Sequence, residues 1–153
     1  MNPSGAANHS MDKMARRALL LLVLLATFWG ALSSCSRAFI VKPEGKYGDT
    51  ISFRFYQLGG GAHTKHNVIE LIVQKKVGDN QWDTVWALSG ERSIDEVEYG
   101  KTYDGLNETT QALPLSLKGE YRVHVKDMPR FDPPGYGYAQ FTFDETGEIV
   151  ILR

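Results

Sequence analysis

Cys35 is the only cysteine of this 153-residue chain, and its thiol is the strongest nucleophile that the sequence offers for covalent modification. It follows one apolar and two small residues: Leu32, Ser33 and Ser34. An apolar segment over 19–29 comes before them, and two basic residues, Arg16 and Arg17, come before that segment. A basic start, an apolar middle and a small-residue cleavage site are the three parts of a secretory signal. Residues 1–34 are therefore predicted to form a helical signal peptide.

The run Leu32-Ser33-Ser34-Cys35 resembles the lipobox, the site at which bacterial lipoprotein signals are cut and the cysteine is acylated. The resemblance implies that Cys35 is the lipidation site and that its acyl chains, such as palmitate, hold the protein in a membrane. Each buried CH₂ group contributes about 0.8 kcal/mol, and two or more chains give stable attachment. In this family an aspartate after the cysteine tends to mark the inner membrane. Because Ser36 stands there, the resemblance implies the outer membrane, facing the periplasm.

Two alternatives to this anchor start from the same segment. A permanent membrane-spanning helix is disfavoured, because the apolar run over 18–32 is interrupted twice and is shorter than the ~20 residues that such a helix needs. Cleavage by the ordinary secretory peptidase, beside Ala31 or Ser34, would release a soluble domain instead. The first 13 residues are polar and add nothing to a signal, so translation starting at Met11 or Met14 also fits the sequence.

Removal of residues 1–34 leaves 119 of the 153 residues, the size of one domain. It takes away three of 17 basic and one of 18 acidic residues, which leaves 14 and 17 and a formal charge of −3. A nucleic-acid partner would need a basic face, so none is predicted. No internal disulfide can form in this part, which must rely on its core. We expect lipid attachment, a short tether and a first strand over 35–49, and a β domain over 50–153.

The rest of the chain shows the period-two alternation of half-buried strands, separated by turn residues. The predicted strands span residues 38–41, 50–57, 68–76, 82–88, 94–99, 119–126, 138–143 and 148–152. Pro43 is expected to end the first strand. The Gly, Asp and Asn residues of 77–81 predict a hairpin, and 100–114 is expected to be a loop with at most one edge strand. Gly147 suits the left-handed position of the last turn.

Seven or eight short strands with regular turns predict an all-β fold, an antiparallel β-sandwich. Residues 50–143 loosely resemble an immunoglobulin-like or fibronectin type III domain in three features. These are an early alternating strand, a hairpin with Trp82 and Trp86, and a segment in which Tyr121 enters the penultimate strand as a tyrosine corner does. The two tryptophans share one face of the predicted strand and are expected in the core. A small β-barrel fits the same strand pattern.

Metal-binding residues are few. His63 and His66 stand three apart in a glycine-rich loop, but a metal site needs further ligands and ordering the loop costs entropy, so a solvated loop is the preferred interpretation. His124 alternates onto the polar side of its strand. Six acidic residues lack calcium-loop spacing and are expected on a solvated edge: Glu91, Asp95, Glu96, Glu98, Asp104 and Glu108. No metal ion or other cofactor is predicted.

The most distinctive surface feature is a segment rich in proline, glycine and aromatic residues over 131–138. Prolines stiffen a loop, and aromatic side chains on a stiff loop give contact area at low entropic cost. Phe131, Tyr136 and Tyr138 are therefore candidate binding residues. In the alternative interpretation, Phe131 and Tyr138 fold back over the core and Tyr136 stacks on a proline.

Catalytic motifs are missing from the sequence: it has no Gly-x-Ser-x-Gly, no His-Glu-x-x-His and no phosphate-binding loop. We therefore predict no catalytic residue, and expect a non-enzymatic, membrane-anchored envelope lipoprotein that binds an envelope protein or polymer or has a structural role. Two alternatives stay open. One is a periplasmic inhibitor or immunity protein with a single tight partner, and the other is a hydrolase of envelope polymer whose carboxylates would have shifted pKa values.

Overall fold

The computed structural model describes residues 37–59, 61–128, 130 and 133–152. These residues form an all-β fold, as predicted. The nine strands are β1 (Arg37–Glu44), β2 (Ser52–Gln57), β3 (His66–Lys76), β4 (Trp82–Ile94), β5 (Glu96–Glu98), β6 (Leu106–Thr110), β7 (Tyr121–Asp127), β8 (Gly135–Phe143) and β9 (Ile149–Leu152). The predicted signal peptide and Cys35 lie outside the described residues. Within the described ranges, we find no helix that is both long and apolar enough to span a bilayer.

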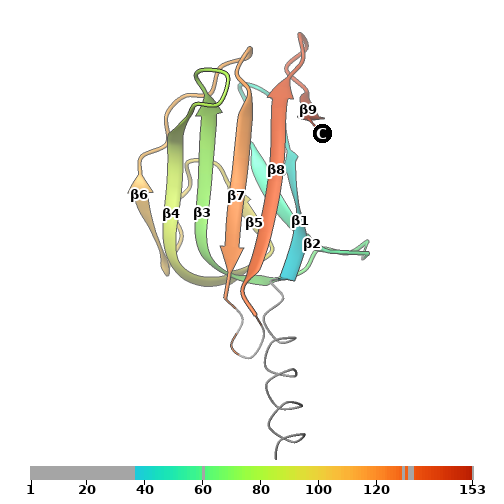
Figure 1. Ribbon diagram of the computed structural model, residues 1–153, viewed down its shortest axis with the longest axis vertical. Coiled ribbons are helices and arrows are strands. Elements are labelled where there is room, and N and C mark those ends of the chain that lie inside the picture. The colour runs from blue at the N-terminus through green and yellow to red at the C-terminus, as the bar shows by residue number, and fades with distance from the viewer. Residues whose placement is uncertain (1–36, 60, 129, 131–132, 153) are drawn as a thin grey trace, which may run out of the picture. The chain divides into compact units, whose positions relative to one another are not determined.

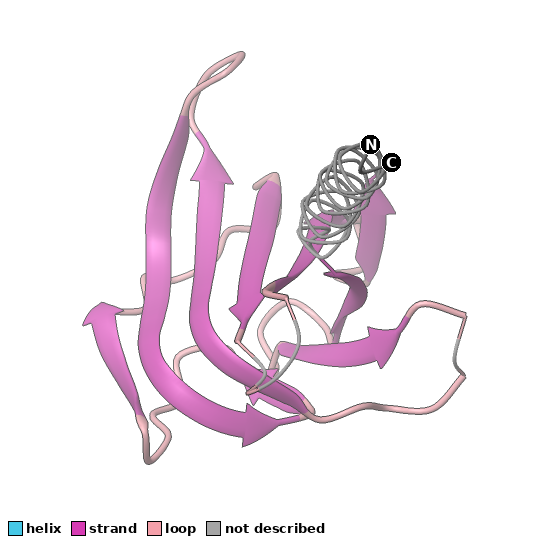
Figure 2. Cartoon of the chain, turned by 60° about the horizontal axis from the view of Figure 1, so that its bottom comes forward, coloured by secondary structure: helices cyan, strands magenta, loops and turns pink. Residues whose placement is uncertain are grey.

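The strands form one mixed sheet with the order β5-β2-β1-β8-β7-β3-β4-β6, and β9 pairs with the far end of β8. The sheet curls into a half-barrel, so that β2 and β5 lie behind the front strands in Figure 1 and the strong bend of the long strands is visible in Figure 2. The two ends of the strand order approach each other. Tyr99, directly after β5, donates a hydrogen bond of 3.2 Å to the carbonyl of Val85 in β4.

The prediction that all strands are antiparallel is wrong for one pair. β1 runs parallel to β8, with Arg37 opposite Gly135 and Ile40 opposite Tyr138. All the other ladders between the named strands are antiparallel. A parallel pair needs a long crossover between its strands, and here nearly the whole domain lies between β1 and β8. β1 is thereby hydrogen-bonded on both sides, to β2 and to β8.

Pro43 does not end the first strand, contrary to the prediction. It pairs with Phe53, and the strand continues to Glu44. β8 pairs with β1 only over residues 37–40, so β8 does not cover that edge of β1 at Pro43. An edge without a ladder partner tolerates a residue that has no amide hydrogen. The other predicted strands are present, with β4 longer than expected and β6 in the segment expected to be mostly loop.

The core is built from the alternating faces that the sequence displays. Tyr121, Val123 and Val125 of β7 point inward, and His124 between them is exposed, both as predicted. The largest fully buried side chains come from strands across the whole strand order: Trp86, Tyr121, Phe53, Phe55, Phe141, Leu71 and Leu88. Each Å² of apolar surface removed from water contributes about 25 cal/mol to folding, so this cluster is the main source of stability.

The two tryptophans of β4 do not share a face, which corrects the expectation from their spacing. Val73 pairs with Trp86 and Gln74 pairs with Thr84, so Val85 is an extra residue and forms a β-bulge. A bulge shifts the alternation of the strand by one residue. Trp86 is therefore fully buried. Trp82 lies partly exposed under the guanidinium of Arg122, 4.3 Å from the ring centroid.

Tyr121 ties the start of β7 to the preceding loop. Its hydroxyl accepts a hydrogen bond of 2.6 Å from the backbone amide of Ser116 and lies 3.3 Å from the carbonyl of the same residue. Gly119 makes room for the ring, since a Cβ atom there would lie 2.3 Å from the Tyr121 hydroxyl. The loop between β6 and β7 is held in place by this contact.

Candidate functional site

A buried histidine and aspartate meet at the end of the sheet where β1, β3 and β8 begin and β7 ends. Nδ1 of His66 lies 2.7 Å from Oδ2 of Asp127, and Nη2 of Arg37 donates to the same oxygen over 3.3 Å. The His66 ring stacks on Phe39 with 4.1 Å between centroids and contacts Phe55 edge-on at 6.0 Å. Packing and hydrogen bonding together fix this imidazole in one orientation.

Both members of the pair are removed from solvent. The side chain of His66 is 7% exposed and that of Asp127 is 1% exposed. Within the part of the chain that the structure describes, Nε2 of His66 and Oδ1 of Asp127 have no hydrogen-bond partner. Gly135 makes space for the carboxylate, because a Cβ atom there would lie 2.1 Å from Oδ1. Buried polar groups depend on their hydrogen-bond partners, so loss of either side chain would leave the other unsatisfied and would be costly.

This arrangement corrects the expectation that the loop of His63 and His66 is solvated. His66 is the first residue of β3 and lies in the core, whereas His63 stays outside and packs on the ring of Tyr56 at 4.8 Å. The two imidazoles therefore face different surroundings. No group of three or more His, Cys, Asp and Glu side chains that could hold a metal ion occurs in the described ranges.

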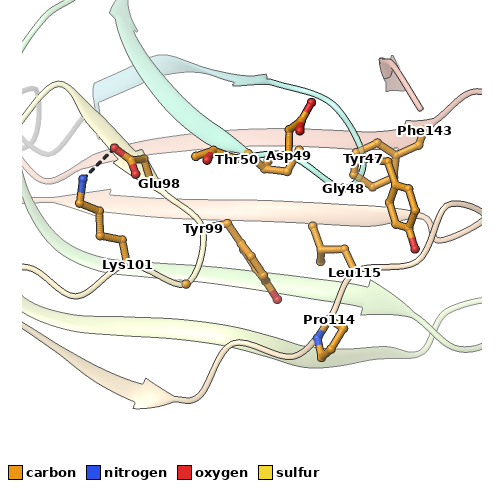
Figure 3. Close-up of a pocket in the computed structure, with 12 residues that line it drawn as sticks. Tyr47, Gly48, Asp49, Thr50, Glu98, Tyr99, Lys101, Pro114, Leu115 and Phe143 are labelled. Atoms are coloured by element: carbon orange, nitrogen blue, oxygen red, sulfur yellow. Dashed lines mark hydrogen bonds and ion pairs between the residues drawn. The ribbon is translucent and has the colours of Figure 1, made fainter. Parts of the chain in front are cut away.

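The opposite end of the half-barrel holds a second candidate binding site. An open cavity of about 930 Å³ lies between the segment that follows β1 and the segments that follow β5 and precede β7 (Figure 3). Its walls combine aromatic, charged and aliphatic side chains: Tyr47, Asp49, Ile51, Glu98, Tyr99, Lys101, Leu115 and Phe143. A cavity of this size can hold a small molecule or a short segment of another chain.

Tyr99 links the segments that form the wall of this cavity. Its hydroxyl lies 2.7 Å from the carbonyl of Leu113 and 3.2 Å from that of Val85. Burial is the main reason that the pKa of Tyr99 is raised above its usual value, so the phenol stays protonated. At the rim, Lys101 lies 2.8 Å from Glu98, and this hydrogen bond raises the pKa of the lysine. Lys101 and Glu98 therefore compensate each other's charge at the rim.

The third feature is an exposed strip of large side chains on the outer face of the sheet. Tyr136 and Tyr138 of β8 are 49% and 50% exposed, and Ile40 of β1, directly opposite Tyr138, is 43% exposed. Gly137 between the tyrosines faces inward, where a Cβ atom would lie 2.4 Å from Phe39. We call Ile40, Tyr136 and Tyr138 the outer strip.

Polar groups border the outer strip. The ammonium of Lys126 lies 5.9 Å from the centroid of the Tyr136 ring, and the ring of His124 lies 4.9 Å from that of Tyr138. Partial burial, followed by the charge of Arg122, lowers the pKa of His124 below its usual value. The imidazole is therefore neutral at neutral pH, and Lys126 supplies the positive charge beside the two tyrosines.

The structure places two of the three aromatic candidates together. Tyr136 and Tyr138 stand on β8, which begins at Gly135, and they are not part of a loop. Phe131 lies outside the described residues. Sequence reasoning missed Asp127, because it follows the last predicted residue of its strand and precedes a proline-rich segment. The alternation of Tyr121, Val123 and Val125 continues to position 127 and was the available signal for its inward orientation.

The acidic residues that raised the question of calcium do not act as one group. Glu108 accepts a hydrogen bond of 2.9 Å from the indole of Trp86, and Glu91 accepts one of 2.9 Å from Asn67. Glu96 pairs with Arg54 at 3.2 Å. These carboxylates support separate strands, and they do not share a cation site.

Comparisons with protein-family models, with curated proteins and with solved structures gave no match to this chain.

Proposed function

We propose that this protein is a membrane-anchored lipoprotein of the bacterial envelope, held by acyl chains on Cys35 and facing the periplasm from the outer membrane. It acts as a non-enzymatic binding module. The lipobox-like run of the sequence supports the anchor. The start of β1 at Arg37, two residues after Cys35, adds that almost no tether separates the anchor from the folded domain. Two extended residues span at most about 7 Å.

The observation that carries the binding function is the outer strip. Ile40, Tyr136 and Tyr138 are each more than two-fifths exposed, although each is large enough to contribute to a core. Two tyrosines two residues apart on one strand present rings about 7 Å apart on the same face. Clustered exposed apolar groups with a polar border are typical of interaction surfaces. The partner is an envelope protein or an envelope polymer.

We further propose that the domain is an immunoglobulin-like sandwich joined at β1. Two features support this. The strand order separates into β5-β2-β1 and β8-β7-β3-β4-β6, with buried side chains from both parts in one core. The contact between the Tyr121 hydroxyl and the Ser116 backbone has the form of a tyrosine corner.

Intact mass spectrometry of the protein purified from its host membranes tests the anchor. We expect a chain that starts at Cys35 and carries acyl mass, and we expect a Cys35→Ala variant to lack that mass and to leave the membrane fraction. An unmodified chain that begins near Ala31 would contradict the anchor and identify a released domain.

Crosslinking in the living host tests the binding surface. A photoreactive amino acid at position 138 is expected to capture a partner, and the same amino acid at Thr109, exposed on edge strand β6, serves as the matched control. Tyr136→Ala with Tyr138→Ala should abolish capture by a photoreactive group at position 40 without changing the circular dichroism of the domain. Equal capture at 109 and 138, or capture that survives the double substitution, would contradict the outer strip as the site. One partner at a one-to-one ratio would favour an inhibitor or immunity protein.

A further inference from the structure

The end of the domain that lies nearest to the proposed anchor is lined by basic side chains. Arg37 is the first described residue and the second after Cys35. The register brings three other strand ends to the same place, since Arg37 lies opposite Gly135, and Asp127 pairs with both Gly135 and Val68. Residues next to these strand ends therefore lie close to the lipid if Cys35 is acylated.

A cavity of about 420 Å³ opens at this end of the sheet. Three of its lining residues are the exposed cations Arg37, Lys65 and Arg130. Ser93 adds a hydroxyl, whereas the side-chain amide of Asn67 already donates to Glu91 and to the carbonyl of Met128. Guanidinium and ammonium groups around a polar cavity match the geometry and charge of a phosphate group.

The two acidic residues of the same cavity are already engaged. Asp127 is 1% exposed, and its Oδ2 receives hydrogen bonds from His66 and Arg37, so its charge is turned away from solvent. Glu91 accepts a hydrogen bond from Asn67 over 2.9 Å. The amide of Asn67 is neutral and does not cancel the charge of the exposed Glu91, so the cavity carries three cations against two carboxylates, and this cationic excess is what attracts an anion.

We infer that this cavity binds the headgroup phosphate of an anionic phospholipid and so holds the domain against the membrane to which Cys35 anchors it. The inference rests on the proposed lipoprotein function, because the anchor is what brings this end to a lipid surface. Arg37, Lys65 and Arg130 contact the phosphate, and Asp127 positions the Arg37 guanidinium. Attraction to an anionic surface is worth about a fivefold change in affinity for each cation.

Native mass spectrometry of the full chain, processed by its host and purified in a non-ionic detergent, tests this. The probes are phosphatidylglycerol and phosphatidylcholine with identical acyl chains, each titrated against the protein. We expect one phosphatidylglycerol per chain, bound at least tenfold more tightly than phosphatidylcholine. The double variant Lys65→Glu with Arg130→Glu should lose at least tenfold of that affinity, and it leaves the contacts between Arg37, His66 and Asp127 in place.

The matched control reverses the charge of two exposed lysines, Lys46 after β1 and Lys118 before β7, which lie at the opposite end of the sheet from the cavity. Lys46→Glu with Lys118→Glu should leave the lipid affinity unchanged. Equal affinity for both lipids, equal loss in both double variants, or inorganic phosphate binding as tightly as the lipid would each overturn the inference. The intact mass of the same sample reports the anchor separately. An acylated chain without lipid preference refutes this inference and leaves the anchor standing. An unacylated chain that selects phosphatidylglycerol refutes the anchor, and with it the role of the cavity beside an anchored Cys35, and leaves only the lipid site.

Discussion

Replacement of Tyr121 by phenylalanine removes a single hydroxyl from the interior of the domain. The Tyr121 side chain is fully buried, and its ring stacks on Phe141 with 5.5 Å between centroids. Phenylalanine keeps this stacking, so the substitution isolates the contacts between the hydroxyl and Ser116, whose backbone amide and side-chain hydroxyl lie 2.6 Å and 3.1 Å from it. The contact with the amide joins the loop before β7 to the core.

The expected loss follows from what the substitution leaves behind. The amide of Ser116 loses its acceptor in a partly buried place, and an unsatisfied polar group of this kind costs about 1–3 kcal/mol. We therefore expect the free energy of unfolding to fall by about 1–3 kcal/mol. For a domain of this size, each 1 kcal/mol lowers the melting temperature by roughly 3–6 °C. Urea unfolding followed by circular dichroism should show a lower midpoint with an unchanged m-value.

Two further variants make the result decisive. Tyr138→Phe also removes a hydroxyl that donates a hydrogen bond, to Gln140 over 2.7 Å, but on the exposed face, so its effect should stay below about 0.5 kcal/mol. Gly119→Ala pushes a methyl group against the Tyr121 ring and hydroxyl, and its cost should not add fully to that of Tyr121→Phe. An effect of Tyr121→Phe no larger than that of Tyr138→Phe would refute the assigned role of the hydroxyl.

Two further substitutions and one titration test the packing around Asp127, the core at Trp86 and the surroundings of His124. Gly135→Ala places a methyl group 2.1 Å from Oδ1 of Asp127, and it should cost about 1–3 kcal/mol of unfolding free energy in urea melts. Trp86→Ala removes a fully buried ring and should cost about 3–5 kcal/mol by the same assay. The NMR titration of His124 should give a pKa below the usual 6.5, because of burial and the charge of Arg122. Its contribution to stability is then present above about pH 6.5 and is lost as the pH falls through the folded-state pKa.

Each of these tests has a control on the same chain. Gly61→Ala meets no atom within 4 Å and should leave the unfolding free energy unchanged. Trp82→Ala removes a partly exposed ring and should cost less than Trp86→Ala. A His124→Gln variant should lose the part of the pH dependence between the two pKa values. A His124 pKa at or above 6.5 would contradict the effect assigned to its partial burial and to the charge of Arg122.

The sequence correctly indicated most strands, because alternation of polar and apolar residues is a local property of the chain. Ile51, Phe53 and Phe55 are all buried as the pattern requires. The bulge at Val85 could not be predicted from that pattern, since it depends on how β4 pairs with β3. Because of this bulge, Trp86 lies in the core and Trp82 stacks under the guanidinium of Arg122.

The candidate site shows the same division. The exposed positions of Tyr136 and Tyr138 follow once β8 is known to start at Gly135, but their aromatic and proline-rich surroundings indicated a loop. His66 also has a polar, glycine-rich neighbourhood in sequence, which favoured a solvated position. Its burial results from a partner 61 residues away, Asp127, and from stacking on Phe39.

By itself, the sequence determined the all-β class, the hairpin of β3 and β4, and the inward face of β7. It also predicts an acylated Cys35. These depend on short-range patterns, or on a motif whose residues are neighbours. The tertiary structure alone decided the parallel pairing of β1 with β8, the burial of His66 against Asp127, and the gathering of Arg37, Lys65 and Arg130 around one cavity. The physical reason is that these contacts join segments from about 30 to 100 residues apart, and their register is set by the packing of the whole sheet instead of any local preference.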